Sequence, residues 1–173
     1  MNKLLASIPV ILLAAATKAA NAELLISGVL DGPLPGGLPK AIELYATEDI
    51  VDLSVYGLGS ANNGGGTDGE EITLNGAAVA GQFLYVASDE TGFEEFLGFV
   101  PDFTSGAASI HGDDAIELFL RGEVIDTFGE IDVDGSGQPW EYTDGWSYRM
   151  MDSNGDSADF VPEDWMFSGP NAL

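Results

Sequence analysis

The segment Ile110–Asp134 constrains the fold more than any other part of this chain. Apolar and polar residues alternate along Ala115–Phe119 and again along Val124–Phe128, and the pair Arg121-Gly122 separates the two runs. Alternation with a period of two is typical of a half-buried strand, and a short glycine-containing turn between two such runs predicts an antiparallel hairpin. Acidic residues crowd both ends of this predicted hairpin.

Short runs of the same kind recur along the chain. We expect loops at the Gly- and Pro-rich segments Asp31–Pro39 and Gly59–Gly69, the second being the most flexible, and a short turn at Pro162–Trp165. The helical spacing within Phe93–Phe99 predicts one helical turn. Seven or eight short strands without a long helix are typical of a β-sandwich or barrel. The remaining strands are expected at Leu24–Leu30, Ala41–Tyr45, Val55–Leu58, Glu71–Leu74, Phe83–Ala87 and Trp146–Met150.

The first 22 residues have the features of an export signal. Lys3 provides a basic start, Leu4–Ala16 is an apolar run too short for a stable membrane anchor, and Ala20-Asn21-Ala22 is a small-residue cleavage site. We therefore expect residues 1–22 to be removed after Ala22 and residues 23–173 to form a single secreted or periplasmic domain. No second long apolar run follows, so no membrane span is expected.

The charge of this expected domain is extreme. All 29 acidic residues follow residue 22, whereas two of the five basic residues precede it, so three basic residues against 29 acidic ones leave a formal charge of −26. High acidity often accompanies disorder, but 45% hydrophobic and 10% aromatic residues favour a folded domain adapted to a salty environment. The chain contains no cysteine, and a domain of this size can form a core without disulfides.

Five segments match, in order, the pattern of one known family: Leu24–Gly32, Lys40–Leu58, Ile72–Ala87, His111–Ile131 and Phe160–Trp165. Together they resemble the lamin tail domain, in the form found in bacterial secreted proteins that include extracellular nucleases. The resemblance covers nearly all of residues 23–173 and implies an all-β, immunoglobulin-like β-sandwich. Because the family is defined by its fold and not by a reaction, the resemblance implies a binding or structural module. A nucleic-acid partner is not expected, since three basic residues cannot form a basic surface.

Acid-rich loops are the candidate calcium sites. Asp113 and Asp114 sit in a turn where both carboxylates could reach one Ca²⁺ ion, or where one of them could instead cap backbone N–H groups. Two further loops partly match the ligand spacing of an EF-hand. The first contains Asp132 and Asp134 but has Thr143 at the twelfth position. The second contains Asp152, Asn154 and Asp156, with Glu163 at the twelfth position but no glycine at the sixth.

Catalytic chemistry finds little support in the sequence. His111 is the only histidine, there is no cysteine, and no G-x-S-x-G nucleophile motif is present. Five aromatic residues gather late in the chain: Trp140, Tyr142, Trp146, Tyr148 and Trp165. They either fill the core or form an exposed platform for a carbohydrate. We expect Trp146 and Tyr148, which alternate on one strand, in the core, and Trp140 and Tyr142, which lie in a polar loop, at the surface.

Three functions remain open from the sequence. The first is an exported, non-catalytic module that binds a protein or carbohydrate partner and is stabilised by Ca²⁺. The second is an accessory module or small hydrolase associated with secreted nuclease or phosphodiesterase systems. The third, based on the charge of −26, is an acidic protein that binds a basic partner.

Overall fold

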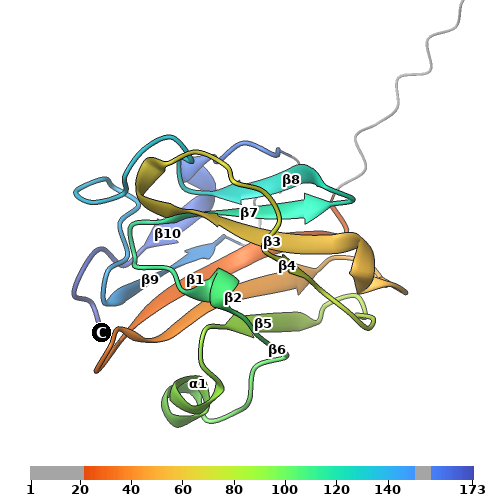
Figure 1. The fold of residues 1–173 in the computed structure, drawn as a ribbon, viewed down its shortest axis with the longest axis horizontal. Helices are drawn as coiled ribbons and strands as arrows, with labels where there is room; N and C mark the ends of the chain where they lie inside the picture. Colours follow the sequence, from red (N-terminus) through yellow and green to blue (C-terminus); the bar gives the residue numbers. More distant parts are fainter. Residues whose placement is uncertain (1–21, 151–156) are drawn as a thin grey trace, which may run out of the picture.

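The computed structural model describes residues 22–150 and 157–173, which form two β-sheets and one short α-helix, α1 (Glu90–Leu97) (Figure 1). All neighbouring strands pair antiparallel except β5 and β6. The larger sheet has the order β10 (Trp165–Phe167), β9 (Gly145–Arg149), β1 (Leu24–Leu34), β2 (Leu38–Ala46), β5 (Phe83–Ala87) and β6 (Phe103–Thr104). The smaller sheet has the order β4 (Ile72–Thr73), β3 (Tyr56–Ala61), β7 (Ala115–Leu120) and β8 (Glu123–Phe128).

The hydrophobic core lies between the two sheets, and both contribute to it. Its fully buried members include Ile26, Ile42, Leu44 and Val86 from the larger sheet and Leu58, Ile116, Leu118 and Phe128 from the smaller one. Outside the register shifts in the β1–β2 and β7–β8 pairs, alternate residues of the strands point to this shared interior, as the period of a strand requires. The described residues therefore form an all-β, sandwich-like protein, as predicted.

The predicted hairpin is confirmed as β7 and β8. Arg121 and Gly122 form its two-residue turn, with φ values of 54° and 83°, as a tight hairpin turn of this handedness requires. The expectation of one solvated face is wrong, because Glu117 and Phe119 on the other face of β7 are 2% and 4% exposed. A Cβ added to Gly59 on β3 would lie 2.2 Å from the carbonyl oxygen of Gly69. The Gly-rich segment therefore packs closely against this face.

Two predicted loops turn out to contain strand. Within Asp31–Pro39, β1 continues to Leu34 and β2 begins at Leu38, so the two strands form one long hairpin. The cross-strand ion pair between Lys40 and Asp31, 2.5 Å from Nζ to Oδ1 and almost fully buried, stabilises this extension. The Gly and Pro content of the segment gave no sign of this pairing. Likewise β3 extends into the start of Gly59–Gly69 and ends at Ala61. The predicted helical turn is confirmed as part of α1.

Short edge strands complete the larger sheet. β10 follows the turn of Pro162–Asp164 and pairs with β9, and β6 pairs with β5 on the opposite edge. Two or three residues are too few for an alternation pattern, which is why neither strand was predicted. Among the described residues, no helix is long and apolar enough to cross a membrane.

Candidate functional site

Asp114 uses its carboxylate to join two loops. It is completely buried, and its two oxygens accept hydrogen bonds from the backbone N–H groups of Asn63, at 2.8 Å, and His111, at 3.0 Å. The hydroxyl of Tyr142 donates to the backbone carbonyl oxygen of Asp114. These contacts match the capping interpretation of the turn. The His111 side chain is mostly exposed, with Nδ1 3.4 Å from the Asp114 carboxylate.

Three further predicted calcium ligands, Asp113, Asp132 and Asp134, lie within the described residues. Asp113 accepts a hydrogen bond from the Ser136 hydroxyl, and Asp134 accepts one from the backbone N–H of Ser136. Asp132 is exposed and lines a separate shallow hollow of about 260 Å³. Within residues 22–150 and 157–173, no three carboxylate or imidazole side chains are grouped to hold a metal ion. Asp152, Asn154 and Asp156 lie outside the described residues. Calcium binding therefore stays a prediction.

The expectation for Trp140 and Tyr142 is wrong, since they are 2% and 0% exposed. Both rings pack edge-on against Phe128 of β8, at centroid distances of 6.1 and 5.4 Å. Trp165 of β10 contacts the same ring at 4.7 Å. The polar loop around Trp140 and Tyr142 therefore folds back over one end of the core, and its aromatic residues bury apolar area that the short strands leave open.

Trp146 and Tyr148 are also placed opposite to expectation. Both rings lie on the outer face of the larger sheet, where Tyr148 is 41% exposed, and Ser147 between them is buried. Alternation correctly assigns the two aromatics to one face, but it cannot tell the inner face from the outer one. Their rings stack on each other, with centroids 5.2 Å apart and planes 14° apart.

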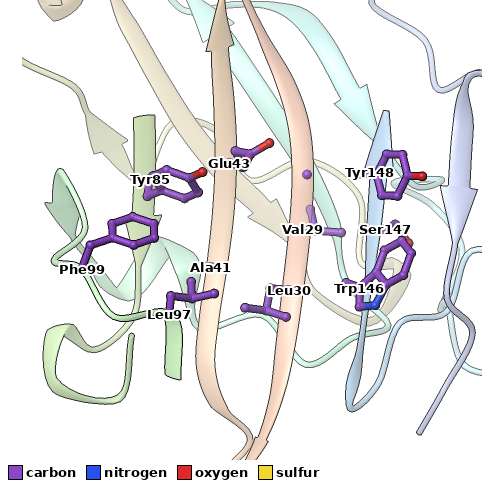
Figure 2. A pocket seen from close by; sticks show the side chains of 11 residues that line it. Val29, Leu30, Ala41, Glu43, Tyr85, Leu97, Phe99, Trp146, Ser147 and Tyr148 are labelled. Atoms are coloured by element: carbon purple, nitrogen blue, oxygen red, sulfur yellow. The ribbon is translucent and has the colours of Figure 1, made fainter. Parts of the chain in front are cut away.

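These two rings form one wall of a groove across the outer sheet face, which we call the aromatic groove (Figure 2). Its volume is about 270 Å³. The strand register explains its shape, because Gly28 and Glu43 lie in one cross-strand row with Tyr148, and Leu30 and Ala41 lie in the next row with Trp146. Small side chains at the centre keep the floor low between the walls. The lining residues are Gly28, Val29, Leu30, Ala41, Glu43, Tyr85, Leu97, Phe99, Trp146, Ser147 and Tyr148.

The opposite wall is formed by Tyr85 of β5 and Phe99, which follows α1 (Figure 2). Phe93 of α1 is fully buried behind them and contacts both rings, at centroid distances of 5.6 Å to Tyr85 and 5.2 Å to Phe99. Asp89 caps the start of the helix, and Gly98 ends it with a φ of 83° and an N–H bond to the carbonyl of Glu94. This left-handed ending turns the chain so that Phe99 packs back against the helix.

A single charged side chain, Glu43, lines the groove among the described residues. A β-bulge in β1 explains how it is held. Ser27 is the extra residue between the paired positions of Ile26 and Gly28, and its hydroxyl donates to Oε1 of Glu43 at 2.7 Å. Such bulges redirect one side chain. Burial, followed by the hydrogen bond and charge of Glu43, raises the pKa of Tyr85 far above its ordinary value, so this hydroxyl stays protonated.

The basic side chains of the described residues lie elsewhere and do not neutralise Glu43. Lys40 is buried against Asp31, and the guanidinium of Arg149 is buried against Asp126, 2.6 Å from Nη2 to Oδ1. Arg121 lies in the β7–β8 turn of the smaller sheet. The aromatic groove therefore combines apolar walls with a fixed carboxylate that forms no ion pair within the described residues.

Comparison with protein-family models, with curated proteins and with solved structures gave no match for this chain.

Proposed function

We propose that this protein is an exported, non-catalytic binding module and that the aromatic groove takes its partner. The observation that carries this proposal is the exposure of aromatic side chains around a pre-formed hollow. Trp146 and Tyr148 on one side and Phe99 on the other remain partly uncovered instead of joining the core. Concave sites lined by aromatic residues with one or two polar groups are typical of binding sites.

The proposal includes the immunoglobulin-like fold of the lamin tail domain. Its support is the ordered set of five sequence segments, together with the two-sheet, all-β architecture of the described residues. Export is supported by the composition of residues 1–22.

Trp146 offers a direct test, because it lines the groove whereas Trp140 and Trp165 are buried. The three indole N–H signals of ¹⁵N-labelled protein can be followed while pools of short oligosaccharides and short peptides are added. We expect at least one pool to shift the Trp146 signal first. The proposal would be abandoned if neither pool moved it, or if shifts clustered around Trp140 instead.

Two variants check that such a response comes from the groove. Trp146→Ala removes half of one wall and should abolish the response of the remaining groove signals. Phe83→Ala is the matched control, since Phe83 is an exposed aromatic residue of the same sheet, 40% exposed, that does not line the groove. It should bind as the unchanged protein does.

A further inference from the structure

We propose that the aromatic groove binds an arginine side chain of a partner protein, with Glu43 as its counter-ion and the aromatic walls stacking on its guanidinium plane. This inference rests on the proposed function and adds the chemistry of the ligand. A guanidinium is flat, permanently charged and weakly hydrated, so it suits a narrow site with aromatic sides and one carboxylate. The groove of about 270 Å³ contains both features.

Charge complementarity supports a cationic occupant. Residues 23–173 carry a formal charge of −26, so the field of the molecule attracts positive groups. Glu43 is the charged residue in the groove lining, and Ser27 holds one of its oxygens. A carboxylate held between apolar walls is costly to desolvate without a partner. A cation from outside would offset that cost.

The polar groups of the groove fit a guanidinium better than a sugar. A sugar ring presents several hydroxyl groups that each need a partner. Of the two tyrosines that line the groove, Tyr148 already donates its hydroxyl to the Met166 sulfur, at 2.9 Å. The remaining lining is dominated by apolar side chains and backbone. One fixed carboxylate between aromatic rings is enough for an arginine, which can stack on the rings and donate to both carboxylate oxygens.

The protein's own core contains the same arrangement. Arg149 pairs with Asp126 and at the same time lies over the ring of Trp165, 4.7 Å from the guanidinium carbon to the ring centroid. Arginine, carboxylate and tryptophan thus form one compact unit there. The aromatic groove supplies the carboxylate and the aromatic rings of such a unit on the surface, without the arginine.

The exposed apolar area around the groove indicates a polypeptide and not a small cation. Phe99, Leu97 and Val100 on one side and Tyr148 and Met166 on the other are each between 37% and 55% exposed. Extended apolar surface of this kind marks contact with another protein. A partner segment that lies across the sheet would cover this rim while its arginine enters the groove.

The test uses a pair of blocked pentapeptides, Gly-Gly-Arg-Gly-Gly and the same peptide with citrulline in place of arginine. Citrulline keeps the planar shape and most of the hydrogen-bonding groups but has no charge. We expect the arginine peptide to shift the Trp146 indole signal and to bind at least tenfold more tightly than the citrulline peptide. Equal binding of the two peptides would overturn the proposal whatever the variants show.

Glu43→Gln is the matched protein variant, because a glutamine side chain can still accept the Ser27 hydrogen bond. It should lose at least tenfold in affinity for the arginine peptide, while Glu48→Gln, at an exposed position outside the groove, should lose none. Unchanged binding by Glu43→Gln would contradict the proposal. If an oligosaccharide moves the Trp146 signal and the arginine peptide does not, the binding function stands and the arginine proposal falls. If nothing moves it, both fall.

Discussion

At the scale of single residues, two buried basic side chains of this acidic protein, Lys40 and Arg149, make specific structural contacts. Arg149 donates from Nε to the carbonyl oxygen of Ile26 and from Nη2 to Asp126, which also accepts the N–H of Ile26. Because Asp126 is on β8 and Ile26 on β1, this cluster ties the two sheets together. Burial raises the pKa of Asp126 above its ordinary value of 3.8, and Arg149 opposes that rise.

Replacing Arg149 by methionine should therefore leave a buried, unpaired carboxylate and cost about 3–5 kcal/mol in free energy of unfolding. Urea denaturation at neutral pH measures this loss. Arg121→Met is the control, because Arg121 is exposed in a turn, and it should change stability by less than about 0.5 kcal/mol. If Arg149→Met and Arg121→Met lost equal free energy of unfolding, the loss would come from removing a positive charge and not from breaking the buried ion pair.

The pH dependence of the same variant has a definite sign. In the folded state the pKa of Asp126 is raised, so the folded protein binds this proton more tightly than the unfolded chain does. Without Arg149 the pKa should rise further. The loss in free energy of unfolding caused by Arg149→Met should therefore be largest at neutral pH. It should shrink as the pH falls through the raised pKa of Asp126 towards 3.8. A deficit that does not change with pH would contradict this account.

At the scale of elements, alternation predicted where most strands lie but not which face they bury. The β7–β8 hairpin and the helical turn before Phe99 were predictable, since their signals are local. The exposure of Trp146 was not, because only the pairing of β9 with β1 decides which side of the strand meets the core. The aromatic groove likewise depends on register between four strands, and no local pattern contains that information.

The helix α1 supports the groove through its ending, and this dependence can be measured. Gly98 has a φ of 83° and nothing within 4 Å of an added Cβ, so alanine there adds backbone strain without a clash. Gly98→Ala should cost about 1 kcal/mol and loosen Phe99. Gly106→Ala, also in open space but without a positive φ, is the matched control and should be close to neutral. Similar thermal melts for the two variants would argue against the strained helix ending.

At the scale of the whole molecule, the proposed export signal can be tested at its predicted cleavage site, after Ala22. β1 begins at Leu24, and the carbonyl oxygen of Glu23 accepts a hydrogen bond from the backbone N–H of Thr47. Cleavage after Ala22 would leave this contact in place and, among the described residues, would remove the bond from the Thr47 hydroxyl to the carbonyl oxygen of Ala22. The predicted cleavage site therefore lies close to the start of β1.

N-terminal sequencing of the protein recovered from the periplasm or the medium should accordingly begin at Glu23. Ala20→Leu and Ala22→Leu, which make the small residues of the cleavage site large, should block processing and leave the protein with its first 22 residues. Ala19→Leu is the control, because position 19 lies outside the three-residue cleavage motif. Recovery of the unprocessed chain from cells that export other proteins normally would refute the signal.

The charge of the whole molecule makes its stability depend on salt. With a formal charge of −26 on residues 23–173, repulsion between surface carboxylates opposes the compact state. Raising NaCl from 10 mM to 1 M shortens the screening length from about 30 Å to about 3 Å. We expect the free energy of unfolding to rise by about 1 kcal/mol or more, which raises Tm by about 2–4 °C for a chain of this size. Choline chloride should act like NaCl if screening is the cause, since the identity of the cation then does not matter. A gain seen with calcium at low millimolar concentration, but not with matched ionic strength of either salt, would instead point to specific cation binding in the acidic loops.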